Sequence, residues 1–300
     1  MSVMPTSRKI LLLAASLLIV TFIAELIGGI AFGSLSLVSD SFHVISDLIS
    51  ILVAYISLSI AQRKVPTQQM AFGYHRLEVI SALFNGLLLS VISAFIFAEA
   101  WSRYRHPATI DTTGALVIAC LGLLVNFIVA SLFHRVSAES KRDINLRAAY
   151  FHILGDILAS FSVVVGIMAI KIFNIPVIDP IVAGFVALLI LIGAGRVLYQ
   201  SAEILLHRSP QDINRVRRRV VHIDGVKDFL DVRLWQVCSH LTVGTAHVIV
   251  SVKTLEETES IKDKIKAIIK DEFNVRDITL ECETQEASVN HQHIFEHKHD

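Results

Sequence analysis

Charged residues are scarce in this chain of 300 residues: 18% are Asp, Glu, Lys or Arg, whereas 53% are hydrophobic. Soluble domains carry about 25% charged residues, so the deficit excludes a purely soluble enzyme and a disordered chain. The formal net charge is zero, so no overall basic field attracts nucleic acid, and we expect no nucleic-acid partner.

Cysteine is also sparse. The three cysteines, Cys120, Cys238 and Cys282, contain no CxxC pair and cannot all pair with one another, which excludes a disulfide scaffold. The sequence has no GxxxxGK[ST] nucleotide-binding loop, so we expect no nucleotide cofactor. It also lacks the HExxH motif of an intramembrane metalloprotease, so we predict that the protein is not an enzyme.

Long apolar segments are what the chain has instead. Each reaches the ~20 residues that cross ~30 Å of hydrocarbon, so we predict six transmembrane helices in residues 1–207. The predicted spans are 10–32, 37–61, 77–101, 113–134, 147–171 and 177–202. Arg8 and Lys9 precede the first span as in a signal peptide, but its apolar run is too long for one, so we expect a retained helix.

Basic residues gather at one set of span ends. Nine Lys and Arg flank that side and three flank the other, which predicts that the N- and C-termini are both cytoplasmic. The three on the minority side are Arg103, Arg105 and Lys171. Because no organelle signal accompanies this pattern, we expect a bacterial inner (plasma) membrane.

Two of the spans carry the same pair of ionisable residues. His43 and Asp47 lie in the second span, and His152 and Asp156 lie in the fifth. A spacing of four places both members of a pair on one helix face. A carboxylate at the bilayer centre costs at least ~2.5 kcal/mol, and a divalent cation would offset that cost. Two nitrogens and two oxygens form a tetrahedral set that suits Zn²⁺. The alternative is that these groups only hydrogen-bond between helices.

Other polar residues of the spans leave two interpretations open. Asp40 lies seven residues before Asp47, so it either attracts ions at an entrance or marks the helix start. A second set serves equally well as interhelical hydrogen-bonding groups or as transport residues. These residues are Glu25, Asn85, Asn126 and Asp179.

The last third of the chain has an ordinary polar composition. Residues 208–284 show the order α-β-β-α-β, with Asp212 as a helix cap and a Cys238–Ser239 connection between the first two strands. This predicts a small cytosolic α+β domain. We expect the remaining residues, 285–300, to form a flexible tail that captures zinc loosely. Its histidines are His291, His293, His297 and His299.

Several segments together resemble the cation diffusion facilitators, and most closely their bacterial zinc exporters and animal zinc transporters. These segments are SDSFHVISD (39–47), FGYHRLEVISALFNG (72–86), NLRAAYFHILGDILAS (145–160), DP (179–180) and LLHRSP (205–210). The resemblance implies a homodimeric, proton-coupled exporter of divalent metals, embedded in lipid, with six membrane helices and a metallochaperone-like cytosolic domain. It also implies that the two His/Asp pairs form the transport site. Relatives with His at the position of His43 are mostly zinc transporters, whereas those with Asp there also tend to accept cadmium.

The chain departs from its relatives at two further metal sites. Some relatives bind metal between the second and third spans, but VPTQQMAFGYHR (65–76) offers only His75, so we expect no metal there. In the cytosolic domain, Leu230 and Arg233 stand where relatives often have histidines. A regulatory site there would use His247, Glu281 and Glu283. The alternative is a plain dimerisation domain.

Secondary active transport is therefore the expected function: Zn²⁺ leaves the cytosol while protons enter. Histidine ligands must lose their protons to bind metal, which links the two fluxes. Cd²⁺, Co²⁺ and Fe²⁺ remain possible substrates because the affinity orders of nitrogen and oxygen sites overlap. The alternative is a membrane metal sensor that binds metal without transporting it.

Overall fold

The computed structural model describes the backbone of residues 5–63, 70–137, 144–252 and 254–284. Within these ranges, side chains are left out for 5–12, 14, 47, 50, 51, 53–63, 132–137 and 144–154. The chain divides into two compact units. We call Met1–Ile56 with Ala82–Leu198 the bundle unit, and Ser57–Ser81 with Tyr199–Asp300 the sheet unit.

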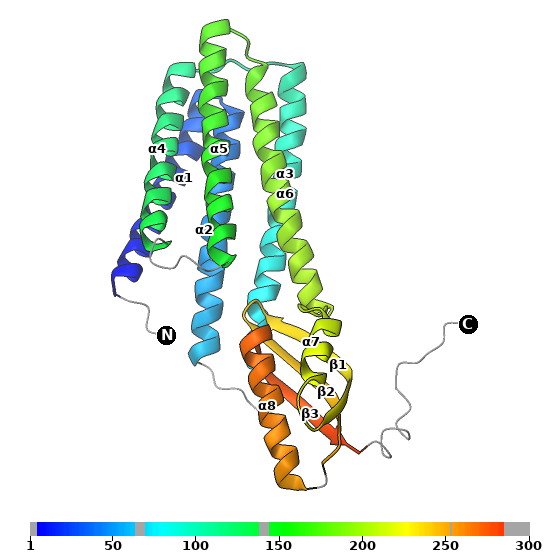
Figure 1. Cartoon of the computed structure of the whole chain (residues 1–300). Coiled ribbons are helices and arrows are strands. Elements are labelled where there is room, and N and C mark those ends of the chain that lie inside the picture. Colours follow the sequence, from blue (N-terminus) through cyan, green and yellow to red (C-terminus); the bar gives the residue numbers. More distant parts are fainter. Residues whose placement is uncertain (1–4, 64–69, 138–143, 253, 285–300) are drawn as a thin grey trace, which may run out of the picture. The chain divides into compact units, whose positions relative to one another are not determined.

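In the described part of the chain, six long helices overlap the segments predicted as spans (Figure 1). They are α1 (Pro5–Phe32), α2 (Leu35–Arg63), α3 (Arg76–Arg105), α4 (Thr112–Ser137), α5 (Ile144–Phe173) and α6 (Ile178–Leu205). Among the residues that the structure describes, five segments have the length and hydropathy of a membrane span. These segments are Ala15–Phe32, Arg76–Arg105, Thr112–Ser131, Gly155–Phe173 and Ile178–Leu205. Much of α2 falls outside that search, because its side chains are partly undescribed.

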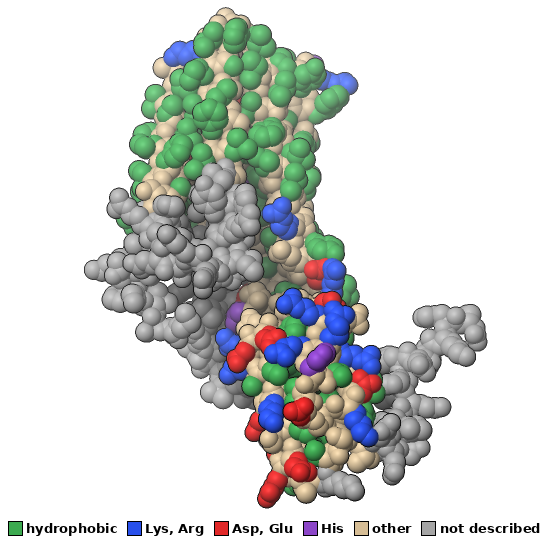
Figure 2. Space-filling model, in the orientation of Figure 1, with side chains coloured by type: hydrophobic (Ala, Val, Ile, Leu, Met, Phe, Trp, Pro, Cys, Tyr) green, Lys and Arg blue, Asp and Glu red, His purple; other side chains and the backbone are tan. Residues whose placement is uncertain are grey.

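The bundle unit carries large apolar side chains on its outside and small ones inside. Ile30, Phe84 and Phe95 are each about 70% exposed, and apolar side chains cover the visible surface of the bundle (Figure 2). Fully buried positions include Ala115 and Ala183. Small residues let membrane helices approach closely. This arrangement is that of a bundle whose outer surface faces lipid.

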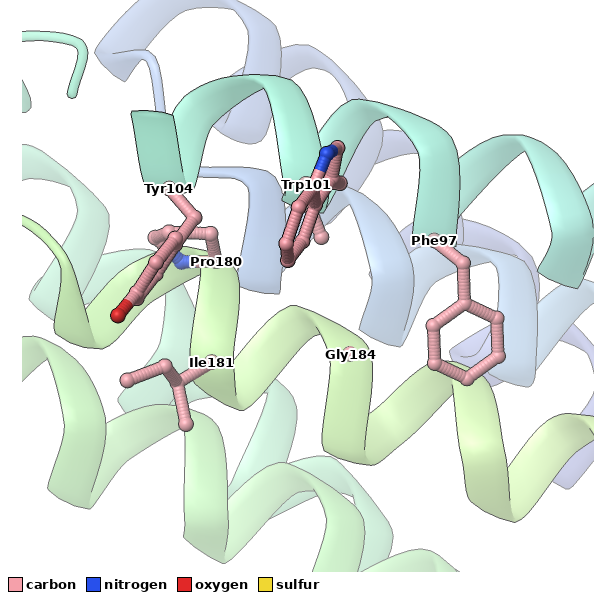
Figure 3. A pocket seen from close by; sticks show the side chains of 7 residues that line it. Phe97, Trp101, Tyr104, Pro180, Ile181 and Gly184 are labelled. Carbon is pink, nitrogen blue, oxygen red and sulfur yellow. The ribbon is translucent and has the colours of Figure 1, made fainter. Parts of the chain in front are cut away.

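An aromatic group marks the C-terminal end of α3. Trp101 and Tyr104 stack with ring centroids 6.1 Å apart, and the Arg105 guanidinium lies 5.0 Å from the Trp101 ring. Both rings extend from α3 towards Pro180 and Ile181 of α6, where they line an open, apolar groove (Figure 3). Tyr and Trp favour the boundary between hydrocarbon and headgroups, so this group is suited to anchor that end of the bundle.

A single carboxylate caps the start of α2. Asp179 on α6 accepts hydrogen bonds from the backbone N–H of Leu35 (2.7 Å) and of Ser36 (3.2 Å). The hydroxyls of Ser34 and Ser36 donate to the same carboxylate, at 2.8 and 2.6 Å. Asp179 is 1% exposed. A buried carboxylate at a helix N-terminus satisfies N–H groups that have no partner within the helix and complements the helix dipole. Asp179 therefore fixes the start of α2 to α6.

Two further hydrogen bonds hold helices of the bundle together. Gly33, between α1 and α2, has φ +75°, and its carbonyl accepts a hydrogen bond from Arg103 Nη1 at 2.7 Å. On the other side of the bundle, the Asn126 amide on α4 donates to Ser160 Oγ on α5 at 2.8 Å. Asp179 and Asn126 thus both form the interhelical hydrogen bonds that were one of their two predicted roles.

The sheet unit has the predicted order of elements. They are α7 (Ile213–Val221), β1 (Val226–Cys238), β2 (Leu241–Val250), α8 (Leu255–Phe273) and β3 (Val275–Glu283). Strand β2 lies in the middle, antiparallel to β1 and parallel to β3. Asp212 caps α7 as predicted. Val216 of α7 and Ile265 of α8 join one core with residues of all three strands. The predicted fold class, a helical membrane bundle with a small α+β domain, is confirmed.

The turn between β1 and β2 differs from the prediction by one residue. Cys238 was expected in the connection, but it is the last residue of β1, paired with Leu241 and fully buried. An irregularity in the register between Gln236 and Cys238 extends β1 to that point. The turn therefore consists of Ser239 and His240.

Replacing Asp179 by Ala should destabilise the bundle markedly. Each buried donor left without a partner costs about 1–3 kcal/mol, and the change affects four donors. Thermal unfolding of the detergent-purified protein should show a clear fall in Tm. Asp179→Asn retains one acceptor oxygen, so its Tm should lie between those of the unaltered protein and Asp179→Ala. Asp111→Ala is the matched control, because exposed Asp111 also caps a helix, through Thr113 and Gly114, but water can replace it. Equal Tm values for the two Ala variants would contradict the role given to Asp179.

Candidate metal sites

The two repeated His/Asp motifs meet inside the bundle unit. His43 Nε2 on α2 lies 3.1 Å from Asp156 Oδ1 on α5, although 113 residues separate them. Their side chains are only 14% and 21% exposed. One nitrogen and one oxygen of the predicted ligand set are therefore brought together, in partly buried surroundings.

Each of the two site helices is also tied to another helix. His43 lies nine residues after Ser34, so about 13 Å of helix separates it from the Asp179 cap. On α5, Ser160 holds the Asn126 hydrogen bond one turn beyond Asp156. Both site helices are thus tied to a neighbour close to the site. The side chains of Asp47 and His152, the other two predicted ligands, lie outside the described residues.

Two acidic residues lie deeper than the sequence indicated. Glu25 of α1 is fully buried, and neither of its carboxylate oxygens has a hydrogen-bond partner among the described residues. Asp40 is 1% exposed and close enough to Glu25 for the two groups to interact electrostatically. Asp40 is therefore enclosed in this conformation, and a role at an entrance would require the bundle to open.

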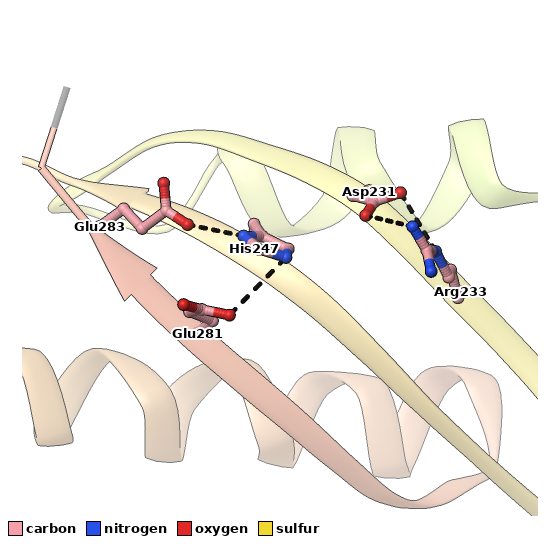
Figure 4. Close-up of polar contacts among 5 residues, drawn as sticks. All are labelled: Asp231, Arg233, His247, Glu281 and Glu283. Atoms are coloured by element: carbon pink, nitrogen blue, oxygen red, sulfur yellow. Dashed lines mark hydrogen bonds and ion pairs between the residues drawn. The ribbon is translucent and has the colours of Figure 1, made fainter. Parts of the chain in front are cut away.

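The predicted ligands of the sheet unit also come together. His247 on β2 lies opposite Glu281 on β3 in the register, with Glu283 two residues further along β3 (Figure 4). His247 Nδ1 is 2.7 Å from Glu283 Oε1, and Nε2 is 3.8 Å from Glu281 Oε2. The three potential ligand atoms lie within 4.8 Å of one another. Glu283 is only 8% exposed, which its contact with His247 accounts for.

The residues that replace the relatives' histidines do not add to this cluster. Arg233 forms an ion pair with Asp231 on the same strand at 2.6 Å (Figure 4). Leu230 pairs with His247 across the sheet but carries no donor atom. The cluster therefore offers one nitrogen and two carboxylates, and the histidine-containing tail, 285–300, lies outside the described residues.

A third cluster joins the residue before α3 to the β1–β2 turn, all within the sheet unit. Cys238 Sγ lies 3.7 Å from His75 Nδ1 and 3.6 Å from both ring nitrogens of His240. Glu78 Oε2 lies 3.6 Å from His240 Nδ1, and Glu78 Oε1 accepts a hydrogen bond from the Ser239 hydroxyl. The potential ligand atoms of His75, Cys238 and His240 also lie within 4.8 Å of one another.

Burial shapes the protonation of this third cluster. It lowers the pKa of His75, and the charge of neighbouring His240 acts in the same direction. It raises the pKa of the Cys238 thiol. Both groups are therefore neutral near pH 7 when no metal is present.

Sequence reasoning missed Cys238 and His240 as candidate ligands. The C-x-H spacing was visible, but it was assigned to a turn, and His75 was judged only against its own segment. A strand pair reverses the chain within two residues, so the partners of His75 lie 163 and 165 positions later in the sequence. No local pattern indicates that distance.

Comparisons with known proteins agree with the fold. The family model described as the cation efflux transmembrane domain matches residues 11–206. The model described as the cation efflux protein cytoplasmic domain matches residues 208–285. Together they account for nearly the whole chain.

Three bacterial relatives are similar over most of their length. The chain is 32% identical to the cadmium, cobalt and zinc/H(+)-K(+) antiporter of Bacillus velezensis, over 97% of this chain and 92% of the relative. It is 30% identical to the metal cation efflux system protein CzcD of Cupriavidus metallidurans, over 87% and 82%. It is 32% identical to the zinc transporter ZitB of Escherichia coli, over 88% and 83%. With both family models matched in order, the chain belongs to the cation efflux family, the cation diffusion facilitators, whose members are multi-pass membrane transporters.

Proposed function

We propose that the protein exports divalent metal cations from the cytosol, zinc first among them, in exchange for protons. The observation that carries this proposal is the 3.1 Å contact between His43 and Asp156. This contact joins one member of each His/Asp pair. A metal ion bound there would take ligands from both α2 and α5.

Four ligands follow from that contact and from helix geometry. Helices α2 and α5 run in opposite directions (Figure 1), so a step of four residues forward on α2 matches a step of four back on α5. From the pair His43 and Asp156 that step leads to Asp47 and His152. We infer that these two complete a site with two nitrogens and two oxygens, the set that suits tetrahedral Zn²⁺.

The same ligands provide the link to protons. A histidine must be neutral to bind a metal ion, and its ordinary pKa of about 6.5 lies within the physiological range. Metal entering from the cytosol would therefore displace protons, and protons entering from the other side would displace metal. The helices that carry the site would rock between the two access states while keeping the ligands together.

Substrate, assembly and location follow the relatives. The Bacillus and Escherichia proteins are named for cadmium, cobalt and zinc and for zinc, respectively, which supports Zn²⁺ as substrate, with Cd²⁺ and Co²⁺ as further candidates. We propose a homodimer in a bacterial inner membrane, with both termini and the sheet unit in the cytoplasm. The cluster of His247, Glu281 and Glu283 would then sense cytosolic metal.

Replacing Asp156 by Asn should abolish zinc flux into proteoliposomes and leave the folded protein intact. The change keeps the side-chain volume but removes the charged ligand. Ser160→Ala is the matched control, because it removes a hydrogen-bonding group one turn away on α5 that is not a proposed ligand. Near-normal flux in Asp156→Asn would contradict the four-ligand site. Binding without flux in the unaltered protein would favour a metal sensor.

Replacing His43 by Asp should shift selectivity towards cadmium. The site would change to one nitrogen and three oxygens, and carboxylates accept the longer bonds of a larger ion, whereas zinc gains most from compact sites that contain histidine. Zn²⁺ and Cd²⁺ fluxes measured side by side should show a lower ratio of zinc to cadmium. An active variant with an unchanged ratio would show that His43 does not set selectivity.

Acidifying the extracytoplasmic side should speed zinc export, because protons there compete with metal for the histidines. In proteoliposomes with a known orientation, an inward proton gradient should raise the flux, and an ionophore that dissipates the gradient should lower it. Flux that ignores the gradient would indicate a facilitative pore.

A further inference from the structure

We propose that His75, Cys238 and His240 form a second kind of metal site, which binds Zn²⁺ or a similar thiophilic divalent ion. It lies in the sheet unit, apart from the His/Asp site of the bundle and from the cluster around His247. The proposal concerns binding at this site and does not depend on the proposed transport function.

The spacing of the three side chains fits a tetrahedral ion. With Zn–S near 2.3 Å and Zn–N near 2.1 Å, a tetrahedral angle places sulfur and nitrogen about 3.6 Å apart. Cys238 Sγ lies 3.7 Å from His75 Nδ1 and 3.6 Å from the nearest nitrogens of His240. Both imidazoles thus already hold the separation from the sulfur that a shared metal ion requires.

The donor set points to a particular class of ion. One thiolate and two imidazoles favour Zn²⁺, Co²⁺ and Cd²⁺ over the oxygen-seeking Mg²⁺ and Ca²⁺. Three protein ligands leave one tetrahedral position for water or a further group. Binding would release the thiol proton of Cys238, since the thiolate is the form that ligates metal.

Glu78 is suited to position His240 in this site. Its carboxylate lies 3.6 Å from His240 Nδ1 and also accepts the Ser239 hydroxyl. If Nε2 binds the metal, Nδ1–H is turned towards a carboxylate, which is the arrangement that commonly orients metal-bound histidines. Glu78 is then a positioning residue, which acts through His240.

Burial alone explains only part of the cluster. A fully buried cysteine is common as a small apolar side chain, and Cys238 is 0% exposed. Apolar packing does not require the imidazole of His75, 163 positions away in the sequence, and that of His240 to lie beside the same sulfur. Our expectation of no metal in residues 65–76 considered ligands from that segment alone; here Cys238 comes from the end of β1 and His240 from the turn after it.

An ion in this site would join two distant parts of the chain. His75 immediately precedes α3, and the other two ligands belong to the end of β1 and the turn after it. Binding would therefore clamp the first residues of a membrane helix to the sheet of the same unit, which gives metal a means to change the stability of that connection.

Titration of the purified, metal-free full-length protein with Co²⁺ tests the proposal. Cobalt bound by a thiolate gives a sulfur-to-metal charge-transfer band in the near ultraviolet, and neither of the other clusters contains sulfur. We expect this band in the unaltered protein, its loss on adding Zn²⁺, and its absence in Cys238→Ser. Since His240 is part-exposed, His240→Ala should fold normally and weaken cobalt binding at least tenfold. Glu78→Gln should keep the band but weaken binding about tenfold.

Matched controls separate this site from other sources of the band. Cys282→Ser and Cys120→Ser remove the two remaining cysteines, and His247→Ala removes the histidine of the other cluster in the sheet unit; all three should keep the band and its affinity. An unaltered protein without the band would overturn the proposal, as would a band that survives Cys238→Ser or disappears in Cys282→Ser. Transport activity does not enter the readout, so the site stands or falls separately from the proposed export.

Discussion

The cost of placing charge in an apolar environment governs this molecule. An ionised group inside the bundle is costly without a partner, because a carboxylate at the centre of a bilayer costs at least ~2.5 kcal/mol. Asp179 meets this requirement with four donors from the start of α2, and Asp156 meets it in part with His43. The first arrangement satisfies its carboxylate fully within the protein. The second joins an acceptor to an imidazole that can exchange its proton for a metal ion.

The same constraint separates the three clusters of ligand residues. Around His247, one carboxylate is buried and one is 61% exposed, so water can share in stabilising the charge. Around Cys238, burial favours neutral groups, and a metal ion would supply the charge that turns the thiol into a ligand. In the bundle, His43 and Asp156 are largely shielded from solvent, so they depend on one another and on whatever ion arrives.

The helices and strands could be predicted from the sequence, whereas most contacts between polar side chains of distant segments could not. The six spans follow from apolar length, and the α-β-β-α-β order follows from periodicity, because both depend on neighbouring residues. The pairing of His43 with Asp156 was predictable because the same four-residue spacing occurs twice. By contrast, Asp179 was expected to form either an interhelical hydrogen bond or part of the transport path, and nothing indicated its partner, the start of α2, which lies 144 positions earlier. Such partners depend on how helices are placed in space, and the sequence of either segment alone does not encode that.

Hydrogen bonds between neighbouring helices limit how the bundle can move. Helix α2 is tied to α6 at its start, and α5 is tied to α4 by Asn126 and Ser160 one turn from Asp156. Separating His43 from Asp156 would leave a partly buried carboxylate without its imidazole. Breaking the Asp179 cap would deprive four buried donors of the acceptor that they share. Both changes are costly, so an opening motion is cheapest if α2 and α5 keep their mutual contact and move together with α6 and α4, the helices to which they are tied. The polar contacts thus select which helices stay together when the bundle opens.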